Sequence, residues 1–293
     1  MFECFLEIAF EAEVHTQEHP ELQELARQLV HEDPATRPAA IQELRDMVYE
    51  RGECTPRRMD DAFLLRFLRA RRFLVPRAHK QLVRYCRFLE QYPELYRDVD
   101  LWGLARVGCA YEGCMLDRPG VGRLTILRFG TWDPDDYPVE ELVKVGMAMM
   151  EIGLRSPKMQ VVGGTVIVDM AGITMKHVAT LTPTIAYQIV CLMGLAIPCV
   201  MNSCHIVNYN WLLNTFFFLF KRFIPKKAWK MIHFHGHDLE SLRQLVDPEC
   251  LPPRYGGTCR HHATIGTWFN KIRKYRDEAF DREMKEFGWV IKE

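Results

Sequence analysis

The chain has 293 residues, 48% of them hydrophobic, and its 38 basic and 38 acidic residues leave no formal net charge. This length suits one large domain with an accessory one, and the neutral balance excludes a whole-molecule field that attracts nucleic acid. Ten cysteines occur without a CxxC pair, a spacing that fits neither a zinc ribbon nor a redox motif. We therefore expect reduced thiols, no metal and no cofactor.

The first 95 residues are predicted to be mainly helical. Residues 1–13 are apolar but carry four glutamates, which makes a poor signal peptide, so we expect a cytoplasmic protein with an N-terminal extension over residues 1–19. Helical periodicity follows at 20–30, through IQELRDMV (41–48) up to a stop at Gly52, at 60–73 and at 76–92. Residues 20–95 are thus predicted to form a helical subdomain.

Strands and helices alternate after residue 100. Apolar, β-branched runs predict strands at 123–129, 161–170, 204–209 and 231–236. Helices are expected at 139–155, at about 183–197, at 211–224 and after Asp238, which can cap a short helix. Such alternation predicts an α/β fold with a mostly parallel sheet and right-handed crossovers.

Residues 177–220 contain no Asp, Glu, Lys or Arg. A transmembrane helix needs about 20 unbroken apolar residues, and prolines and asparagines interrupt this stretch too often. We interpret it as a buried strand flanked by two buried helices around something large and apolar.

Seven short motifs occur in a characteristic order. They are DDAFLLRFLRAR (60–71), WDP (132–134), TVIVDMAG (165–172), LTP (181–183), HIVN (205–208), IHFHG (232–236) and LPPRYGG (251–257). Over about residues 35–260 the chain resembles the CRAL-TRIO, or Sec14-like, lipid-binding proteins, with the α-tocopherol transfer protein and cellular retinaldehyde-binding protein branch as the nearest match.

The resemblance implies a fold and a function. It implies a helical bundle, then a domain at 96–260 whose sheet floors an apolar cavity closed by a helical lid, and a helical tail at 261–293. It also implies a monomeric carrier of one small hydrophobic lipid, such as a tocopherol or a retinoid, and not an enzyme. The pocket positions so implied are Trp132, Val143, Gly146, Met147, Met150, Val168, Leu181, Ile185, Ile189, Leu192, Met193 and Ile197.

One departure from the family bears on the ligand. Gly146 and Met150 stand where tocopherol-binding relatives carry serine hydroxyls. A pocket without them suits a less polar ligand, or one whose polar end meets Tyr187, Thr182 or water.

Residues 211–227, WLLNTFFFLFKRFIPKK, match the lid of the family. Helical spacing predicts two adjacent apolar faces, so such a helix must bury two sides. A buried core helix with a basic end is the alternative. The predicted lid residues are Leu212, Leu213, Phe216, Phe217, Leu219, Phe220 and Phe223.

A basic patch is expected beside the lid. Arg71 and Lys227 match phosphoinositide-contacting positions of relatives, whereas Val200, Asn202 and Met231 stand at other positions expected to be basic. Substitutes could come from Lys221, Arg222, Lys226 and Lys230. Diffuse attraction to anionic membranes is therefore favoured over specific phosphoinositide recognition.

Other functions find less support. A protein-interaction module with lipid as a structural filler is the alternative of a different class. His233, His235 and His237 alternate and could hold a metal, but the segment matches a family strand. Asp169 could act as a general base, although a hydrogen-bonding role is favoured.

Overall fold

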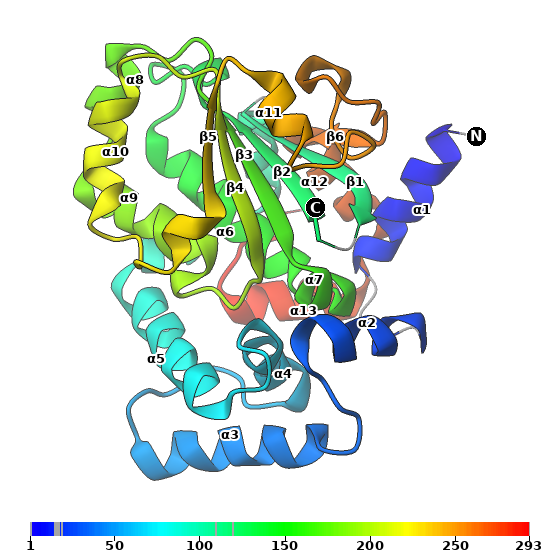
Figure 1. Ribbon diagram of the computed structural model, residues 1–293. Coiled ribbons are helices and arrows are strands. Elements are labelled where there is room, and N and C mark those ends of the chain that lie inside the picture. The colour runs from blue at the N-terminus through cyan, green and yellow to red at the C-terminus, as the bar shows by residue number, and fades with distance from the viewer. Residues whose placement is uncertain (1, 15–17, 19, 109, 119, 293) are drawn as a thin grey trace.

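The computed structural model describes residues 2–14, 18, 20–108, 110–118 and 120–292. It is a mixed α/β fold in which helices precede and then flank a six-stranded sheet, as Figure 1 shows. The strands are β1 (Tyr111–Arg118), β2 (Gly122–Arg128), β3 (Gly164–Asp169), β4 (Met201–Val207), β5 (Ile232–Gly236) and β6 (His262–Thr264). The helices are α1 (Phe2–Val14), α2 (Pro20–Val30), α3 (Arg37–Arg51), α4 (Asp61–Ala70), α5 (Val75–Gln91), α6 (Val139–Gly153), α7 (Pro157–Val162), α8 (Met175–Ala179), α9 (Pro183–Val190), α10 (Leu213–Lys221), α11 (Leu239–Arg243), α12 (Ile265–Tyr275) and α13 (Glu278–Phe287).

The sheet is mostly parallel, as predicted. Its strand order is β5-β4-β3-β2-β1-β6, and the pairs β2–β3, β3–β4 and β4–β5 are parallel. The pairs β1–β2 and β1–β6 are antiparallel. The sequence did not predict β1 and β6, because neither segment is a clear β-branched run.

Side chains that alternate along β3 show how the sheet divides the interior. Thr165, Ile167 and Asp169 are buried, while Val166 and Val168 are only partly buried. Successive side chains of a strand point to opposite faces. One face is packed against α11 and the loop that follows it, and the other lies beneath α6, α9 and α10 (Figure 1).

Two segments differ from the sequence-based expectation for a clear backbone reason. The strand expected over 161–170 begins at Gly164, because residues 161–162 end α7 and Gly163 turns the chain at φ +68°. The helix expected over 183–197 ends as an α-helix at Val190. A wider helical turn follows over Cys191–Leu195, and Gly194, at φ +105°, ends the helical backbone. Asp238 caps α11 as predicted, since its carboxylate accepts from the backbone N–H of Ser241.

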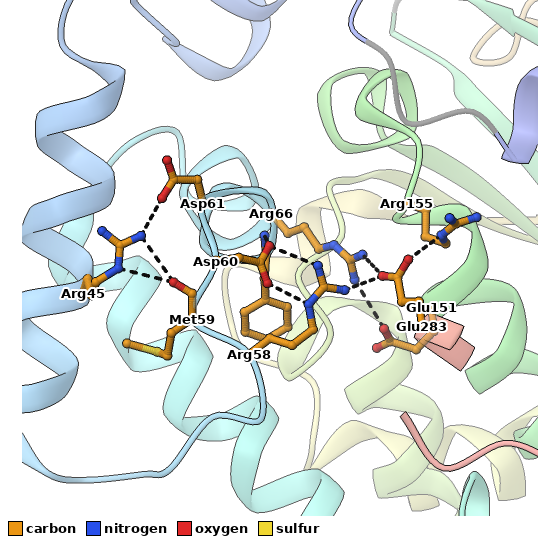
Figure 2. A network of polar contacts seen from close by, with 10 residues as sticks. Arg45, Arg58, Met59, Asp60, Asp61, Arg66, Glu151, Arg155 and Glu283 are labelled. Carbon is orange, nitrogen blue, oxygen red and sulfur yellow. Dashed lines mark hydrogen bonds and ion pairs between the residues drawn. The ribbon is translucent and has the colours of Figure 1, made fainter. Parts of the chain in front are cut away.

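The C-terminal helix α13 joins the helical region to the sheet domain through buried charges (Figure 2). Glu283 accepts from Arg155 Nε at 2.7 Å and from Arg66 Nη2 at 3.2 Å, and it also pairs with Arg58. Burial alone would raise the pKa of Glu283, but the charges of Arg66 and Arg155 hold this pKa below its ordinary value. Arg66 reaches α6 as well, where Glu151 Oε2 lies 3.4 Å from its Nη1.

Candidate functional site: an apolar cavity under helix α10

A cavity of about 630 Å³ lies between the sheet and the helices α6, α9 and α10. This volume is within the range of about 300–1,000 Å³ that is usual for pockets binding small molecules. Its floor is built by alternate side chains of four strands. They are Thr125 and Leu127 of β2, Val166 and Val168 of β3, Cys204 and Ile206 of β4, and Ile232 and Phe234 of β5.

Helix α6 supplies part of the roof. Val143, Gly146, Met149 and Met150 line the cavity, as their spacing of three and four residues places them on one helical face. A Cβ atom at Gly146 would lie 3.0 Å from Leu192 Cδ1, so the glycine lets the chain after α9 approach closely.

Helix α10 closes another side of the cavity. Leu213, Phe216, Phe217 and Phe220 line it, and the ring of Phe216 meets that of Phe129 edge-on at 5.2 Å. Phe217 meets Phe234 of the floor at 5.6 Å between ring centroids. These aromatic contacts hold α10 in place over the cavity. The α10 residues that line the cavity are all uncharged.

The wall is flexible and uncharged over most of its area. Six methionines line it, and their thioether side chains adapt to irregular ligands. Burial raises the pKa of Cys199 to about 11 and that of Cys204 to about 12, so these free thiols stay neutral. The methionines are Met149, Met150, Met170, Met193, Met201 and Met231.

Four cations line the same cavity, namely Arg71, Arg72, Arg84 and Lys227, and none of its lining residues is acidic. Arg71 Nη2 donates to the carbonyl oxygen of Gly194 at 2.9 Å. This carbonyl is available because the helical backbone is interrupted at Gly194. Burial lowers the pKa of Arg71, and the neighbouring Arg84 lowers it further. The described residues give Arg71 no carboxylate partner, so its charge is uncompensated.

Comparisons with known proteins agree with this architecture. The family model "CRAL/TRIO domain" matches residues 121–257, and the model "CRAL/TRIO, N-terminal domain" matches residues 40–84. Clavesin-1 of Xenopus laevis is 30% identical over 271 residues, covering 90% of this chain and 81% of that protein. The chain belongs to the CRAL/TRIO family.

Further relatives of this CRAL/TRIO protein are also clavesins. Clavesin-2 of Homo sapiens is 29% identical over 279 residues, covering 94% of this chain and 85% of that protein. The crystal structure of Sfh5 covers 84% of this chain and 99% of that chain at 14% identity, with a TM-score of 0.45. The sequence matches support the Sec14-like, lipid-binding family as a whole and do not single out the tocopherol and retinaldehyde branch.

The structure brings seven of the twelve predicted pocket residues to the cavity wall, and five lie outside it. Those at the wall are Val143, Gly146, Met150, Val168, Ile189, Leu192 and Met193. Those outside are Trp132, Met147, Leu181, Ile185 and Ile197.

The residues outside the wall are held by other contacts or face another way. Trp132 donates from its indole nitrogen to the carbonyl of Tyr137 at 2.7 Å and packs edge-on against Phe129. Met147 is fully buried on a different face of α6 from Gly146. Tyr187 and Thr182, expected near a polar end of the ligand, also lie outside: Thr182 caps α9 by accepting from Ile185 N.

Strand alternation could have revealed more of the floor. Side chains two residues apart on a strand point to the same face. Val166 therefore faces the cavity together with Val168 on β3, and Ile232 and Phe234 face it together on β5. Arg84 on α5 carries no such signal, because only tertiary packing brings that helix to the cavity.

Only some of the predicted lid residues line the cavity. Leu213, Phe216, Phe217 and Phe220 line the cavity, whereas Leu212, Leu219 and Phe223 do not. The ring of Phe223 packs against Tyr187 of α9 at 5.4 Å. The helix itself is shorter than the predicted 211–224, since it begins at Leu213 and ends at Lys221.

The predicted basic residues divide in the same way. Arg71 and Lys227 line the cavity, while Lys221, Arg222 and Lys226 are exposed and lie outside its wall. Val200 and Met231 are part of the wall, and Asn202 donates to the carbonyl of Val162 at 2.9 Å.

The histidines of β4 and β5 form a hydrogen-bonded row on the packed face of the sheet. His205 Nδ1 lies 2.9 Å from His235 Nε2, and His205 Nε2 lies 2.8 Å from Ser203 Oγ. Burial, with the nearby His235 and His233, lowers the pKa of His205 to about 4. No group of three His, Cys, Asp or Glu in the described part of the chain is placed to hold a metal.

Asp169 is held by hydrogen bonds at the end of β3. Its Oδ2 accepts from the buried Tyr255 hydroxyl at 2.7 Å, and its Oδ1 accepts from Asn208 Nδ2 at 3.0 Å. These hydrogen bonds give the carboxylate the structural partners that were favoured over a role as a general base.

No helix among the residues described is long and apolar enough to span a bilayer.

Proposed function

We propose that this CRAL/TRIO protein carries one small hydrophobic lipid in the cavity and passes it to membranes when α10 moves aside. The observation that carries the proposal is the cavity of about 630 Å³ with its largely apolar wall. An apolar space of this size leaves many wall atoms without partners unless a ligand fills it.

The outer side of α10 supports a role as a lid. Trp211, just before the helix, and Phe218 on it are 70% and 79% exposed, which is unusual for large aromatic side chains. Burial in a bilayer is worth roughly 1.5–3 kcal/mol for each such side chain, which helps to offset the packing energy that α10 gives up when it leaves the cavity. Lys221 and Arg222 follow at its end, and each is worth about 1 kcal/mol beside an anionic leaflet.

The wall favours a ligand with an apolar body. On α6, Gly146 and Met150 offer no hydroxyl, and the Tyr111 hydroxyl already donates to the carbonyl of Leu142 at 2.9 Å. Tocopherols, retinoids and similar lipids with few polar atoms suit such a wall. We place this carrier in the cytoplasm as a monomer that visits membranes transiently and does not bind nucleic acid, and its free thiols agree with a reducing compartment.

A transfer assay with paired variants tests the lid. Phe218→Asp should slow transfer of a fluorescent tocopherol analogue between vesicles about tenfold, with affinity within twofold of the wild type. Phe216→Asp should lower the affinity itself, because Phe216 lines the cavity. Since Phe216 lines the cavity and Phe218 does not, Phe218 is the cleaner choice for testing transfer.

The control is Tyr49→Asp, on another aromatic side chain that is 70% exposed but lies on α3. It should leave both transfer and affinity unchanged. Normal transfer by Phe218→Asp would contradict the lid mechanism. A wild-type protein that binds neither the analogue nor any cellular lipid would contradict the carrier function.

A second candidate function is recognition of anionic lipid headgroups, phosphoinositides included. It is favoured by the four cations that line the cavity with no acid among the lining residues. Arg84→Glu should weaken binding to vesicles that contain phosphoinositide, and Arg87→Glu, one turn along α5 and outside the wall, is the control. Equal effects of the two variants would show that vesicle binding depends on diffuse surface charge and not on headgroup recognition in the cavity.

A further inference from the structure

A second, smaller chamber lies beyond one wall of the cavity. Its volume is about 50 Å³, room for roughly three to five water-sized spheres. It continues along the same face of the sheet, over β1 and β2 and beside α12. Met115, Met159 and Trp268 line it, and none of these three residues lines the large cavity.

The two spaces share one wall, made by Tyr111, Thr125, Met149 and Met150. Tyr111 is fixed by its hydrogen bond to the carbonyl of Leu142, and Thr125 stands on β2. Met149 and Met150 are only partly buried, although they face inward from α6. Because a methionine side chain has three rotatable bonds, these two residues are the movable part of the wall.

Two glycines keep the small chamber open. A Cβ atom at Gly153 of α6 would meet only Met159 Cγ, at 4.0 Å, and one at Gly113 of β1 would meet only the Leu124 carbonyl oxygen, at 3.9 Å. Neither glycine has the left-handed backbone that would require it. Protein interiors are otherwise close-packed, so side chains missing at both positions indicate space kept for something else.

We propose that the two spaces are one ligand site with a tail subsite. The body of the lipid occupies the large cavity, and a slender hydrocarbon tail passes between Met149 and Met150 into the small chamber. This inference rests on the proposed carrier function and specifies its ligand class. Among the apolar lipids that suit the wall, the subsite selects those with a slender, extended hydrocarbon chain, since a chamber of about 50 Å³ is too small for a ring system.

The test compares chain-length dependence in full-length variants. Fatty alcohols of increasing length displace a fluorescent fatty-acid probe from the wild type, from Gly153→Leu and from Gly113→Val. The two variants fill the small chamber from opposite walls, and neither position lines the large cavity. Leucine is a better helix former than glycine, so Gly153→Leu should fold. Val168→Phe, which fills the large cavity, is the matched control.

In the wild type, each methylene that enters the small chamber should tighten binding about fourfold. In Gly153→Leu and Gly113→Val this gain should stop at a shorter chain, with short alcohols bound within twofold of the wild type. Val168→Phe should weaken all lengths alike. The same length dependence in the wild type and both glycine variants would overturn the tail subsite and leave the carrier intact. Failure of every alcohol to bind, with no co-purifying lipid, would overturn the carrier and the subsite together.

Discussion

Neighbouring side chains of β3 and β4 meet two different interiors. On one face of the sheet, Ile167 and Val207 are fully buried in a solid cluster with Leu242 of α11. On the other face, Val168 and Ile206 border the cavity. Polar groups on the solid face are paired with each other, whereas the cavity face is apolar with cations at its edge. The same strands therefore support stability on one side and an open space on the other.

The difference has a physical consequence for mutation. A side chain on the solid face touches partners all round, so shortening it creates a void that the neighbours cannot close. A side chain on the cavity face already lacks partners on one side and loses less. If one face is solid and the other hollow, matched substitutions should differ between them in the lipid-free protein.

The largest difference is expected for isoleucine. Ile167→Ala should lower the free energy of unfolding by about 2–5 kcal/mol, because Ile167 is fully buried on the solid face. Ile206→Ala on the adjacent strand should lower it by less than about 2 kcal/mol, since its side chain borders the cavity. Urea denaturation of delipidated protein measures both, and equal losses would mean that the cavity is filled by protein.

The next effect is a pH dependence that belongs to the solid face. The pKa of His205 is lowered from 6.5 to about 4, so between these values the unfolded chain binds more protons than the folded one. Stability contributed by neutral His205 is complete above pH 6.5 and is lost as the pH falls to 4, a change of roughly 3 kcal/mol.

Denaturation midpoints across this pH range measure the effect. His205→Gln should flatten the dependence, leaving a smaller slope from His235, whose pKa burial also lowers. His237→Gln on the exposed turn after β5 is the control and should keep the full slope. An unchanged slope in His205→Gln would show that other groups cause the pH dependence.

Two tyrosines extend the comparison with a smaller effect. Tyr255→Phe removes a buried donor from Asp169 and should lower stability by about 1–3 kcal/mol. Tyr111→Phe at the cavity wall leaves only a backbone carbonyl, that of Leu142, without its donor and should lower stability by about 0.5–1.5 kcal/mol. Thermal denaturation of the two variants ranks them, and the reverse order would contradict the assignment of the faces.

The smallest effect on stability is expected for a substitution that fills space. Val168→Phe should change the free energy of unfolding by less than about 1 kcal/mol, since the cavity can accept the ring. Ile167→Phe on the solid face should cost about 1–3 kcal/mol by overpacking. Calorimetry of both variants checks this, and strong destabilisation by Val168→Phe would show that no free space adjoins Val168.

The sequence predicted the parallel strands and α6 well because their patterns are local. Apolar runs mark β3 and β4, and the family motifs fall on the same segments. It missed β1, where YEGCMLDR carries charges and a glycine, because pairing with β2 rather than composition makes it a strand. The floor of the cavity follows from alternation once the strands are known. Arg84 does not, since the docking of α5 brings it to the cavity.

The most direct test of an enclosed lipid is native mass spectrometry of the freshly purified protein. We expect a species carrying one lipid per chain, which delipidation removes, vesicles restore and Val168→Phe reduces. A protein that appears only at its bare mass, before and after incubation with vesicles, would contradict the central claim that this fold encloses a lipid.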